Sequence, residues 1–228
     1  MLIEIENLLD AATVARFRDA LLDADWQDGR ATAGYQSALA KRNKQLAASD
    51  PLARALGDEV AAALDHNLAF HAATIPARVF PSLFNRYDVG DGFGAHIDGA
   101  YRPLAEGGAL RTDLSLTLFL SDPADYDGGE LVIESGTRET RVKLPAGSAA
   151  LYPATTLHRV EPVTRGTRLA AFTWVQSRVA DTRKRAILFD IDIAIQSLRP
   201  RVGDADAALI ALTSSYHNLL RLWGDGSA

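Results

Sequence analysis

The chain has 228 residues, of which 47% are hydrophobic and 23% charged, and its formal net charge is −5 at pH 7. This length allows one domain with a substantial core, and the composition is that of an ordinary globular protein. The absence of cysteine excludes disulfide scaffolds, Cys-based zinc sites, iron–sulfur clusters and thiol nucleophiles. The negative charge argues against nucleic acid as a general partner, because phosphate binding requires a basic surface.

The sequence predicts a cytoplasmic protein. Residues 1–17 lack the basic start and the apolar stretch of a secretory signal, and no segment has the uninterrupted apolar length that spans a bilayer. We therefore expect no membrane partner. Because cysteine is missing, any bound metal must be held by His, Asp, Glu or backbone oxygen.

The first part of the chain is typical of a short strand followed by a helix. Residues 2–5 are predicted to form the strand, and Asp10 is a candidate N-cap for the helix. The apolar positions that recur after it at helical spacing are Val14, Phe17, Leu21 and Leu22. A polar, glycine-containing connection is expected over residues 26–34.

A second helical region is predicted before the chain turns to β-structure. Residues 36–46 are polar but compatible with a helix. Asp50 and Pro51 resemble an N-cap followed by proline in the first turn. A helix is therefore expected to begin there and to run to about Ala69.

After Pro76 the pattern changes to short β-type runs separated by Asp-Gly, Gly-Gly and Pro-Ala-Gly turns. Gly128 and Gly129 are expected to form one such turn, because glycine tolerates positive φ. The predicted strands span residues 78–87, 114–120, 130–134, 139–144, 149–152, 159–162 and 169–176. Many short, closely spaced strands are typical of a sandwich or a jelly-roll barrel.

The chain returns to helical periodicity from Asp181 onward. Two helical blocks are predicted, with a break at residues 199–203 that contains a proline and a glycine. An apolar stripe in the second block, through Leu209 and Tyr216, suits either packing on the chain's own barrel or pairing with a second copy. Both a monomer and a homo-oligomer stay open at this point.

Three residues form a candidate metal site. His96 and Asp98 follow a glycine-rich turn, and in an extended backbone residues two apart point to the same side, so both can reach one ion. His158 lies immediately before a late predicted strand, which intervening barrel strands can bring close to the first two. Two imidazoles and one carboxylate match the facial triad that leaves three positions open on an octahedral iron.

Arg168 adds a feature that a metal site alone does not need. It lies on the strand predicted after His158. A fixed guanidinium there can pair bidentately with a dicarboxylate that lies across the metal. The alternative is an ordinary surface ion pair.

These residues, with their surroundings, resemble the prolyl 4-hydroxylase-type Fe(II)/2-oxoglutarate oxygenases and, more narrowly, the bacterial PKHD-type hydroxylases. The resemblance to the wider group covers residues 76–178, and the narrower one extends over nearly the whole chain. The matching segments are Tyr87 to Asp98, Leu114 to Asp122 with the following Gly128-Gly129-Glu130-Leu131, and Tyr152-Pro153 to His158 with Arg168.

The resemblance implies both a fold and a site. The expected fold is α+β: a double-stranded β-helix (jelly-roll) barrel with N-terminal helices packed on it and a C-terminal helical extension. The expected oxygenase domain is 1–178, with its jelly-roll core at about 76–178, and the extension is 179–228. His96, Asp98 and His158 are the implied iron ligands, and Arg168 is implied to bind the C5 carboxylate of 2-oxoglutarate.

The resemblance also implies the reaction. Fe(II) is the expected cofactor, 2-oxoglutarate and O2 are the expected co-substrates, and ascorbate is a candidate reductant. Oxidative decarboxylation of 2-oxoglutarate is expected to be coupled to hydroxylation of a C–H group on a protein side chain, a peptide or a small molecule related to iron uptake. The substrate pocket is expected to use loops such as residues 98–111 and the N-terminal segment.

Tyr87 is a secondary candidate, because its hydroxyl can contact co-substrate or substrate. The alternative is an ordinary half-buried tyrosine on a strand.

Two other functions stay open for the whole chain. One is a cupin-like metalloenzyme that does not use 2-oxoglutarate, and the other is a non-catalytic β-barrel binding protein. Arg168 discriminates between these hypotheses, because only a dicarboxylate co-substrate needs that anchor.

Overall fold

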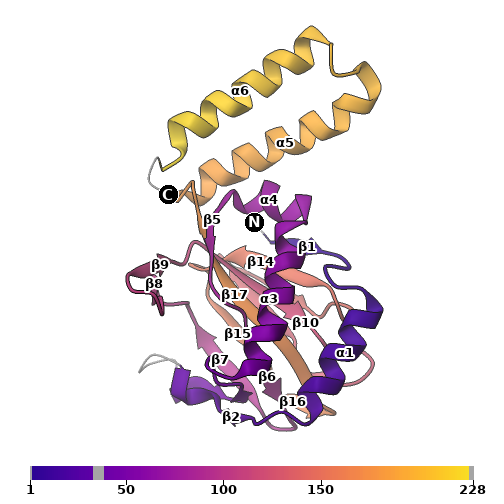
Figure 1. The fold of residues 1–228 in the computed structure, drawn as a ribbon, viewed down its shortest axis with the longest axis vertical. Coiled ribbons are helices and arrows are strands. Elements are labelled where there is room, and N and C mark those ends of the chain that lie inside the picture. Colours follow the sequence, from indigo (N-terminus) through magenta and orange to yellow (C-terminus); the bar gives the residue numbers. More distant parts are fainter. Residues whose placement is uncertain (1, 33–38, 226–228) are drawn as a thin grey trace.

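The computed structural model describes residues 2–32 and 39–225, and within them five α-helices accompany two large antiparallel β-sheets (Figure 1). The larger sheet comprises, in spatial order, β1 (Ile3–Ile5), β14 (Ala149–Pro153), β10 (Leu114–Phe119), β17 (Arg168–Ser177), β6 (Leu83–Tyr87), β4 (Lys44–Gln45) and β2 (Gln27–Asp28), with β5 (Pro76–Val79) paired to β17 outside this order. The smaller sheet comprises β13 (Arg138–Val142), β12 (Leu131–Ser135), β15 (His158–Val160), β7 (Gly92–His96) and β3 (Lys41–Arg42). Two short ladders join β8 (Tyr101–Pro103) to β9 (Ala109–Arg111) and β11 (Asp127–Gly128) to β16 (Val163–Arg165).

Three N-terminal helices cover one face of the larger sheet: α1 (Ala11–Leu22), α3 (Pro51–Asp65) and α4 (Leu68–Thr74) (Figure 1). The two predicted N-caps are confirmed, because carboxylate oxygens of Asp10 and Asp50 accept hydrogen bonds from the first-turn amides of Thr13 and Leu52, each at 2.7 Å. The helices therefore begin where the sequence indicated.

One helical prediction is wrong, and a second segment, called compatible with a helix, is mostly extended. The helix after Pro51 ends at Asp65, and Asn67 caps the separate helix α4 by accepting from the amide of Phe70. The helix-compatible segment 36–46 begins outside the described residues; residues 39–40 are helical, and residues 41–42 and 44–45 form the short strands β3 and β4. Pairing with β7 and β6 decides their conformation, since weak local preference yields to a sheet edge that offers hydrogen bonds.

Most of the predicted strands are present, with boundaries that shift by at most two residues for six of the seven. The run 78–87 divides into β5 and β6 around Pro81, because proline cannot donate to a ladder. Strand β7 was expected only as a glycine-rich turn. Gly128 and Gly129 do adopt positive φ, at 69° and 66°, as predicted for a turn.

The alternation of residues along the central strands separates the two faces of the larger sheet. On β10, Leu114, Leu116 and Leu118 join the core beneath the helices. Phe119 belongs to a second core, to which β6, β12, β14 and β15 also contribute, so this second core lies between the two sheets. Successive residues of a strand point to opposite faces, so one strand serves both layers.

The C-terminal residues form a helical hairpin of α5 (Thr182–Val202) and α6 (Ala207–Trp223), which projects away from the sheets (Figure 1). The predicted break at 199–203 is partly wrong, because α5 continues through Pro200 and ends at Gly203. A proline in the last turn removes one backbone donor but leaves the earlier turns intact. Gly203 ends the helix with a φ of +81°, where glycine is favoured.

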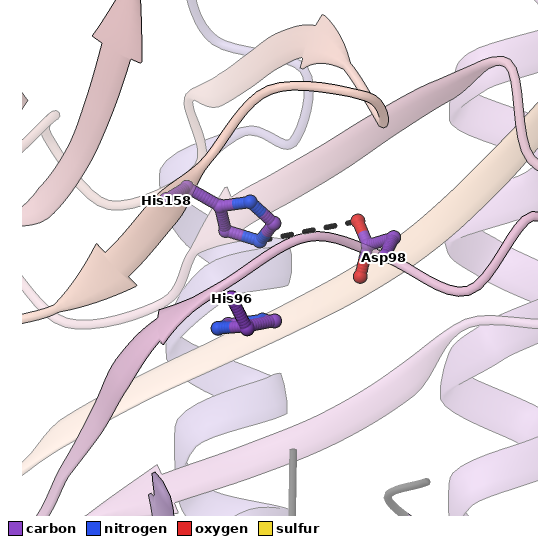
Figure 2. A group of neighbouring side chains, drawn as sticks. All are labelled: His96, Asp98 and His158. Carbon is purple, nitrogen blue, oxygen red and sulfur yellow. Dashed lines mark ion pairs between the residues drawn. The ribbon is translucent and has the colours of Figure 1, made fainter. Parts of the chain in front are cut away.

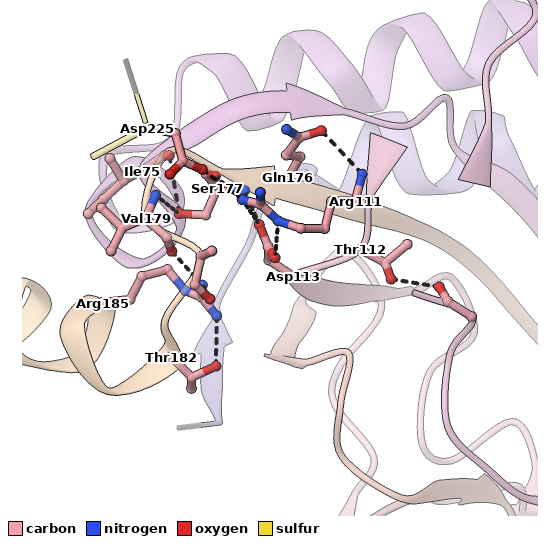
Figure 3. A network of polar contacts seen from close by, with 12 residues as sticks. Ile75, Arg111, Thr112, Asp113, Gln176, Ser177, Val179, Thr182, Arg185 and Asp225 are labelled. Carbon is pink, nitrogen blue, oxygen red and sulfur yellow. Dashed lines mark hydrogen bonds and ion pairs between the residues drawn. The ribbon is translucent and has the colours of Figure 1, made fainter. Parts of the chain in front are cut away.

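A polar network joins the hairpin to the end of β17 (Figure 3). Arg111 donates to the carboxylates of Asp113 and Asp225 and to the carbonyl of Ser177. Buried Arg185, near the start of α5, donates to the carbonyl of Val179 at 2.6 Å. The base of the hairpin is thus held by charge-assisted hydrogen bonds, which are stronger than neutral ones.

None of the helices within 2–32 and 39–225 has the length and apolarity needed to cross a membrane.

Phe17 is expected to carry much of the contact between α1 and the sheet. Its ring is fully buried and packs edge-on against Phe84 of β6, with centroids 6.4 Å apart. Phe17→Ala should lower the free energy of unfolding by about 3–5 kcal/mol, through lost burial and a cavity, measured by urea denaturation. Leu22→Ala is the matched control on the same helix: Leu22 is one of the apolar positions named from the sequence but is 64% exposed, so a similar loss there would contradict this assignment.

Candidate metal centre

The structure brings the three predicted metal-ligating residues together (Figure 2). His96 ends β7, and His158 begins β15 as its direct Cα partner in the antiparallel ladder. Asp98 follows two residues after His96, where the chain leaves the strand. One ligand atom from each side chain lies within 4.8 Å of the other two, and the Nε2 atom of His158 is 3.9 Å from Oδ2 of Asp98.

Backbone carbonyls orient both imidazoles. Nδ1 of His96 is 2.8 Å from the carbonyl oxygen of Gly94, and Nδ1 of His158 is 2.9 Å from that of Thr156. A carbonyl can only accept, so each Nδ1 carries the proton and each Nε2 presents its lone pair. A metal bound through Nε2 requires this tautomer, and the hydrogen bond that sets it is typical of metal-bound histidine.

The surroundings of the three residues favour a neutral imidazole and an oriented carboxylate. Burial, and then the neighbouring His158, lower the pKa of His96 to about 4. The hydroxyl of Ser115, on β10, donates to Oδ2 of Asp98. Two neutral imidazoles and one carboxylate form a donor set suited to a divalent first-row metal such as Fe(II).

Arg168 lies on the opposite sheet and faces the same cavity. Positions 168, 170, 172 and 174 of β17 line this cavity, because alternate residues of a strand share one face. The side chain of Arg168 is 1% exposed, and its guanidinium carbon lies 5.1 Å from the ring centroid of Tyr87 and 5.2 Å from that of Phe119. Among the described residues, no group accepts a hydrogen bond of normal geometry from its Nε or Nη2 atoms, although the buried hydroxyl of Tyr126 lies close enough to interact with the guanidinium.

This unsatisfied guanidinium is costly unless a ligand pairs with it. The surface ion pair considered as the alternative for Arg168 is therefore wrong. The cavity has a volume of about 610 Å³ and also contains His96, Asp98 and His158. A dicarboxylate that binds a metal at one end and Arg168 at the other fits the groups present.

Tyr87 is buried more deeply than the sequence indicated. It is 2% exposed, lies opposite Arg168 in the ladder between β6 and β17, and lines the cavity. Burial raises the pKa of its hydroxyl, which accepts a hydrogen bond from Asn85 at 3.3 Å. Its ring packs beside the guanidinium of Arg168.

Several cavity residues were not predicted individually: Lys41, Arg102, Ser115, Phe172 and Trp174. Arg102 lies in the loop region 98–111 and Lys41 in the N-terminal segment, the two regions expected to build the substrate pocket. Ser115, Phe172 and Trp174 occupy alternate strand positions that the periodicity could have assigned to the cavity face. Lys41 was not singled out, because its segment was considered only as compatible with a helix and no strand was predicted there.

Family comparisons agree with the class of protein that this site defines. Residues 82–176 match the model of the 2OG-Fe(II) oxygenase superfamily, and residues 182–225 match that of the PKHD-type hydroxylase C-terminal domain. A prolyl hydroxylase from Trichoplax adhaerens, in complex with a peptide fragment of the hypoxia inducible factor oxygen degradation domain, superposes with a TM-score of 0.54 at 15% identity, covering 82% of this chain and 86% of that one. HygX from Streptomyces hygroscopicus, with nickel, 2-oxoglutarate and hygromycin B bound, superposes with a TM-score of 0.54 at 15% identity, covering 77% and 82%.

Full-length relatives narrow the class. A PKHD-type hydroxylase from Paraburkholderia phytofirmans is 54% identical over 99% of this chain and 100% of its own length. One from Methylobacterium nodulans is 52% identical over the same shares. The chain belongs to the PKHD-type hydroxylase family and is an Fe(II)/2-oxoglutarate-dependent dioxygenase.

The hydroxyl of Ser115 is expected to support metal binding through Asp98. Ser115→Ala should weaken Fe(II) affinity about 10- to 100-fold, because hydrogen bonds to ligating groups typically have effects of this size. Anaerobic titration with Fe(II) measures the change. Ser121→Ala also deletes a buried hydroxyl, but one that donates to Thr167 away from the cavity, so an equal loss of affinity there would refute a specific role for Ser115.

Proposed function

We propose that His96, Asp98 and His158 hold the Fe(II) of this hydroxylase, and that Arg168 binds the C5 carboxylate of 2-oxoglutarate. The observation that carries the proposal is the buried guanidinium of Arg168, with two unsatisfied nitrogens, in the same cavity as the three ligand atoms. A charged donor without an acceptor is unfavourable in a buried site, so its retention favours an anionic ligand.

The two histidines lie on the smaller sheet, and Arg168 lies on the larger sheet. His96 and His158 present Nε2, and Asp98 presents its carboxylate on the same side. Bound Fe(II) and 2-oxoglutarate supply the oxidising chemistry with O2. The reaction yields succinate and carbon dioxide and converts a C–H group of the substrate to C–OH. Arg168 holds the far end of the co-substrate and thereby orients its reactive end toward the three ligands.

Tyr87 is proposed to position Arg168. Its ring lies beside the guanidinium, at a distance where a cation and an aromatic ring attract one another. Gly129 leaves room for the arginine stem, since an added Cβ at 129 would lie 3.1 Å from Cδ of Arg168. We therefore assign both residues to the shape of the co-substrate end of the cavity.

The finer features are part of the proposal. The two packed sheets are inferred to form a double-stranded β-helix, with 1–178 as the oxygenase domain and 179–228 as the helical extension. Ascorbate is proposed as a reductant that maintains Fe(II). The hydroxylated group is proposed to belong to a prolyl or lysyl residue or to a small molecule linked to iron uptake. Membership of the family favours this reading over a cupin-like enzyme without 2-oxoglutarate and over a non-catalytic barrel.

Replacing Arg168 by methionine tests the assignment. Arg168→Met should weaken 2-oxoglutarate binding about 10- to 150-fold, since a hydrogen bond to a charged group contributes about 1.5–3 kcal/mol, while Fe(II) still binds. Succinate formed from 2-oxoglutarate in air gives the KM, and anaerobic calorimetry gives the affinity. Arg165→Gln is the control, because Arg165 forms an exposed pair with Asp127 that contributes little. Unchanged affinity in Arg168→Met would refute the proposed anchor.

Replacing His158 tests the metal site independently. A folded His158→Ala protein should lose Fe(II) binding, and with it the weak visible absorption band that Fe(II) and 2-oxoglutarate give together under anaerobic conditions. Circular dichroism checks the fold, because His158 is buried. If this variant forms succinate at the same rate as the unaltered protein, His158 is not a metal ligand.

A further inference from the structure

The cavity contains two cations that the proposed iron and co-substrate site does not use. Lys41 comes from β3 at the edge of the smaller sheet, and Arg102 comes from β8 in the loop after Asp98. Both line the cavity that contains Arg168 and the three candidate ligands. Among the described residues that line it, Asp98 is the only acidic one.

Arg102 is held on an aromatic surface with part of its hydrogen-bonding capacity unused. Its guanidinium carbon lies 3.8 Å from the ring centroid of Trp174, a stacked arrangement that orients the planar group. The Nε atom is buried without an acceptor among the described residues. Burial lowers its pKa, and the nearby charge of Asp98 acts in the opposite direction.

Lys41 lies farther along the same wall. The side chain is 5% exposed, and Nζ donates to Oε1 of Gln45 at 2.8 Å. Nζ is also 5.5 Å from the ring centroid of Phe93 and 5.9 Å from that of Phe172. Burial, and then the charge of Arg102, lower its pKa to about 8, while the charge of Asp28 acts in the opposite direction, so the ammonium form still predominates at neutral pH.

Aromatic contacts connect both cations to the metal centre. Phe93 stacks on His96 with ring centroids 3.6 Å apart, and Phe172 packs edge-on against Trp174 at 5.3 Å. Lys41 contacts Phe93 and Phe172, while Arg102 contacts Trp174. The wall beside the metal centre is therefore apolar and carries both cations, which are close enough for the charge of Arg102 to act on Lys41.

The charges of the site show which ligand this wall favours. Fe(II) and Arg168 together would balance Asp98 and the two carboxylates of 2-oxoglutarate. Lys41 and Arg102 then repel one another in a partly desolvated cavity. The charge of Asp28, which does not line the cavity, also acts on Lys41, and an anionic group bound by both cations would relieve their repulsion further. The cavity volume of about 610 Å³ is in the range of small-molecule sites.

We propose that the primary substrate carries a carboxylate, which Arg102 and Lys41 bind, and an apolar portion that packs on Phe172 and Trp174. This inference rests on the proposed function, because it takes the cavity beside the three ligands as the substrate site. A free organic acid and the C-terminus of a peptide share this chemistry, and both are compatible with the groups present.

Acid and amide probes test the proposal without turnover. The protein is loaded with Fe(II) and saturating 2-oxoglutarate under anaerobic conditions, so that Arg168 is occupied. Calorimetry then compares phenylacetate with phenylacetamide, and a capped peptide ending in phenylalanine with its C-terminal amide. At least one acid should bind about tenfold more tightly than its amide, as expected for charge-assisted hydrogen bonds. Preference within the first pair indicates a free acid, and within the peptide pair alone a peptide C-terminus.

Variants assign the preference to the two cations. Arg102→Gln and Lys41→Met should each reduce the acid preference about threefold, because each cation supplies part of the roughly tenfold total, and Arg102→Lys should restore part of it by keeping the charge. Arg138→Gln is the matched control, since Arg138 is an exposed residue of β13 outside the cavity. Thermal unfolding establishes that each variant is folded.

The outcomes separate this inference from the function on which it rests. If the Fe(II)–2-oxoglutarate absorption band does not form in the unaltered protein, the proposed function fails. If the band forms but neither acid binds more tightly than its amide, including the case in which no probe binds, only the substrate inference is overturned. An acid preference that persists in both Arg102→Gln and Lys41→Met would also overturn the assignment to these residues.

Discussion

The antiparallel pairing of β7 with β15 is the interaction on which the rest of the site depends. It makes His96 and His158 direct partners across one ladder, although 61 residues lie between them in the chain. The ladder supplies a rigid spacing that loops would not provide, and local carbonyls then orient each ring. Asp98 needs no strand of its own, because it follows His96 by two residues.

The larger sheet provides the second half of the site through its two unlike faces. Leu169 and Ala171 of β17 join the core beneath the helices, whereas Arg168, Phe172 and Trp174 face the cavity. A shift of one residue in register would exchange these sets and place the arginine among leucines. The N-terminal helices thus contribute to function indirectly, because the apolar core they form with the sheet holds its register.

Local chemistry explains which features could be predicted from the sequence. The caps at Asp10 and Asp50 depend on a few neighbouring residues, and both are present. The prediction that the helix from Pro51 continues to Ala69 was wrong, because Asn67 caps a separate helix. The helix-compatible segment 36–46 contains the strands β3 and β4, because β7 and β6 offer them hydrogen bonds. Local preference amounts to tenths of a kcal/mol per residue, and tertiary pairing overrides it.

The sequence by itself determined the residue types of the site: a His-x-Asp pair, a later histidine, an arginine and no cysteine. These types limit the chemistry, because a ligand's donor atoms and charge belong to the residue wherever it lies. Only the tertiary structure decided that Arg168 is buried with unsatisfied nitrogens, and that Lys41 and Arg102 share its cavity. Burial and proximity arise from contacts between segments far apart in the chain, and such contacts leave no periodic signal in any one segment.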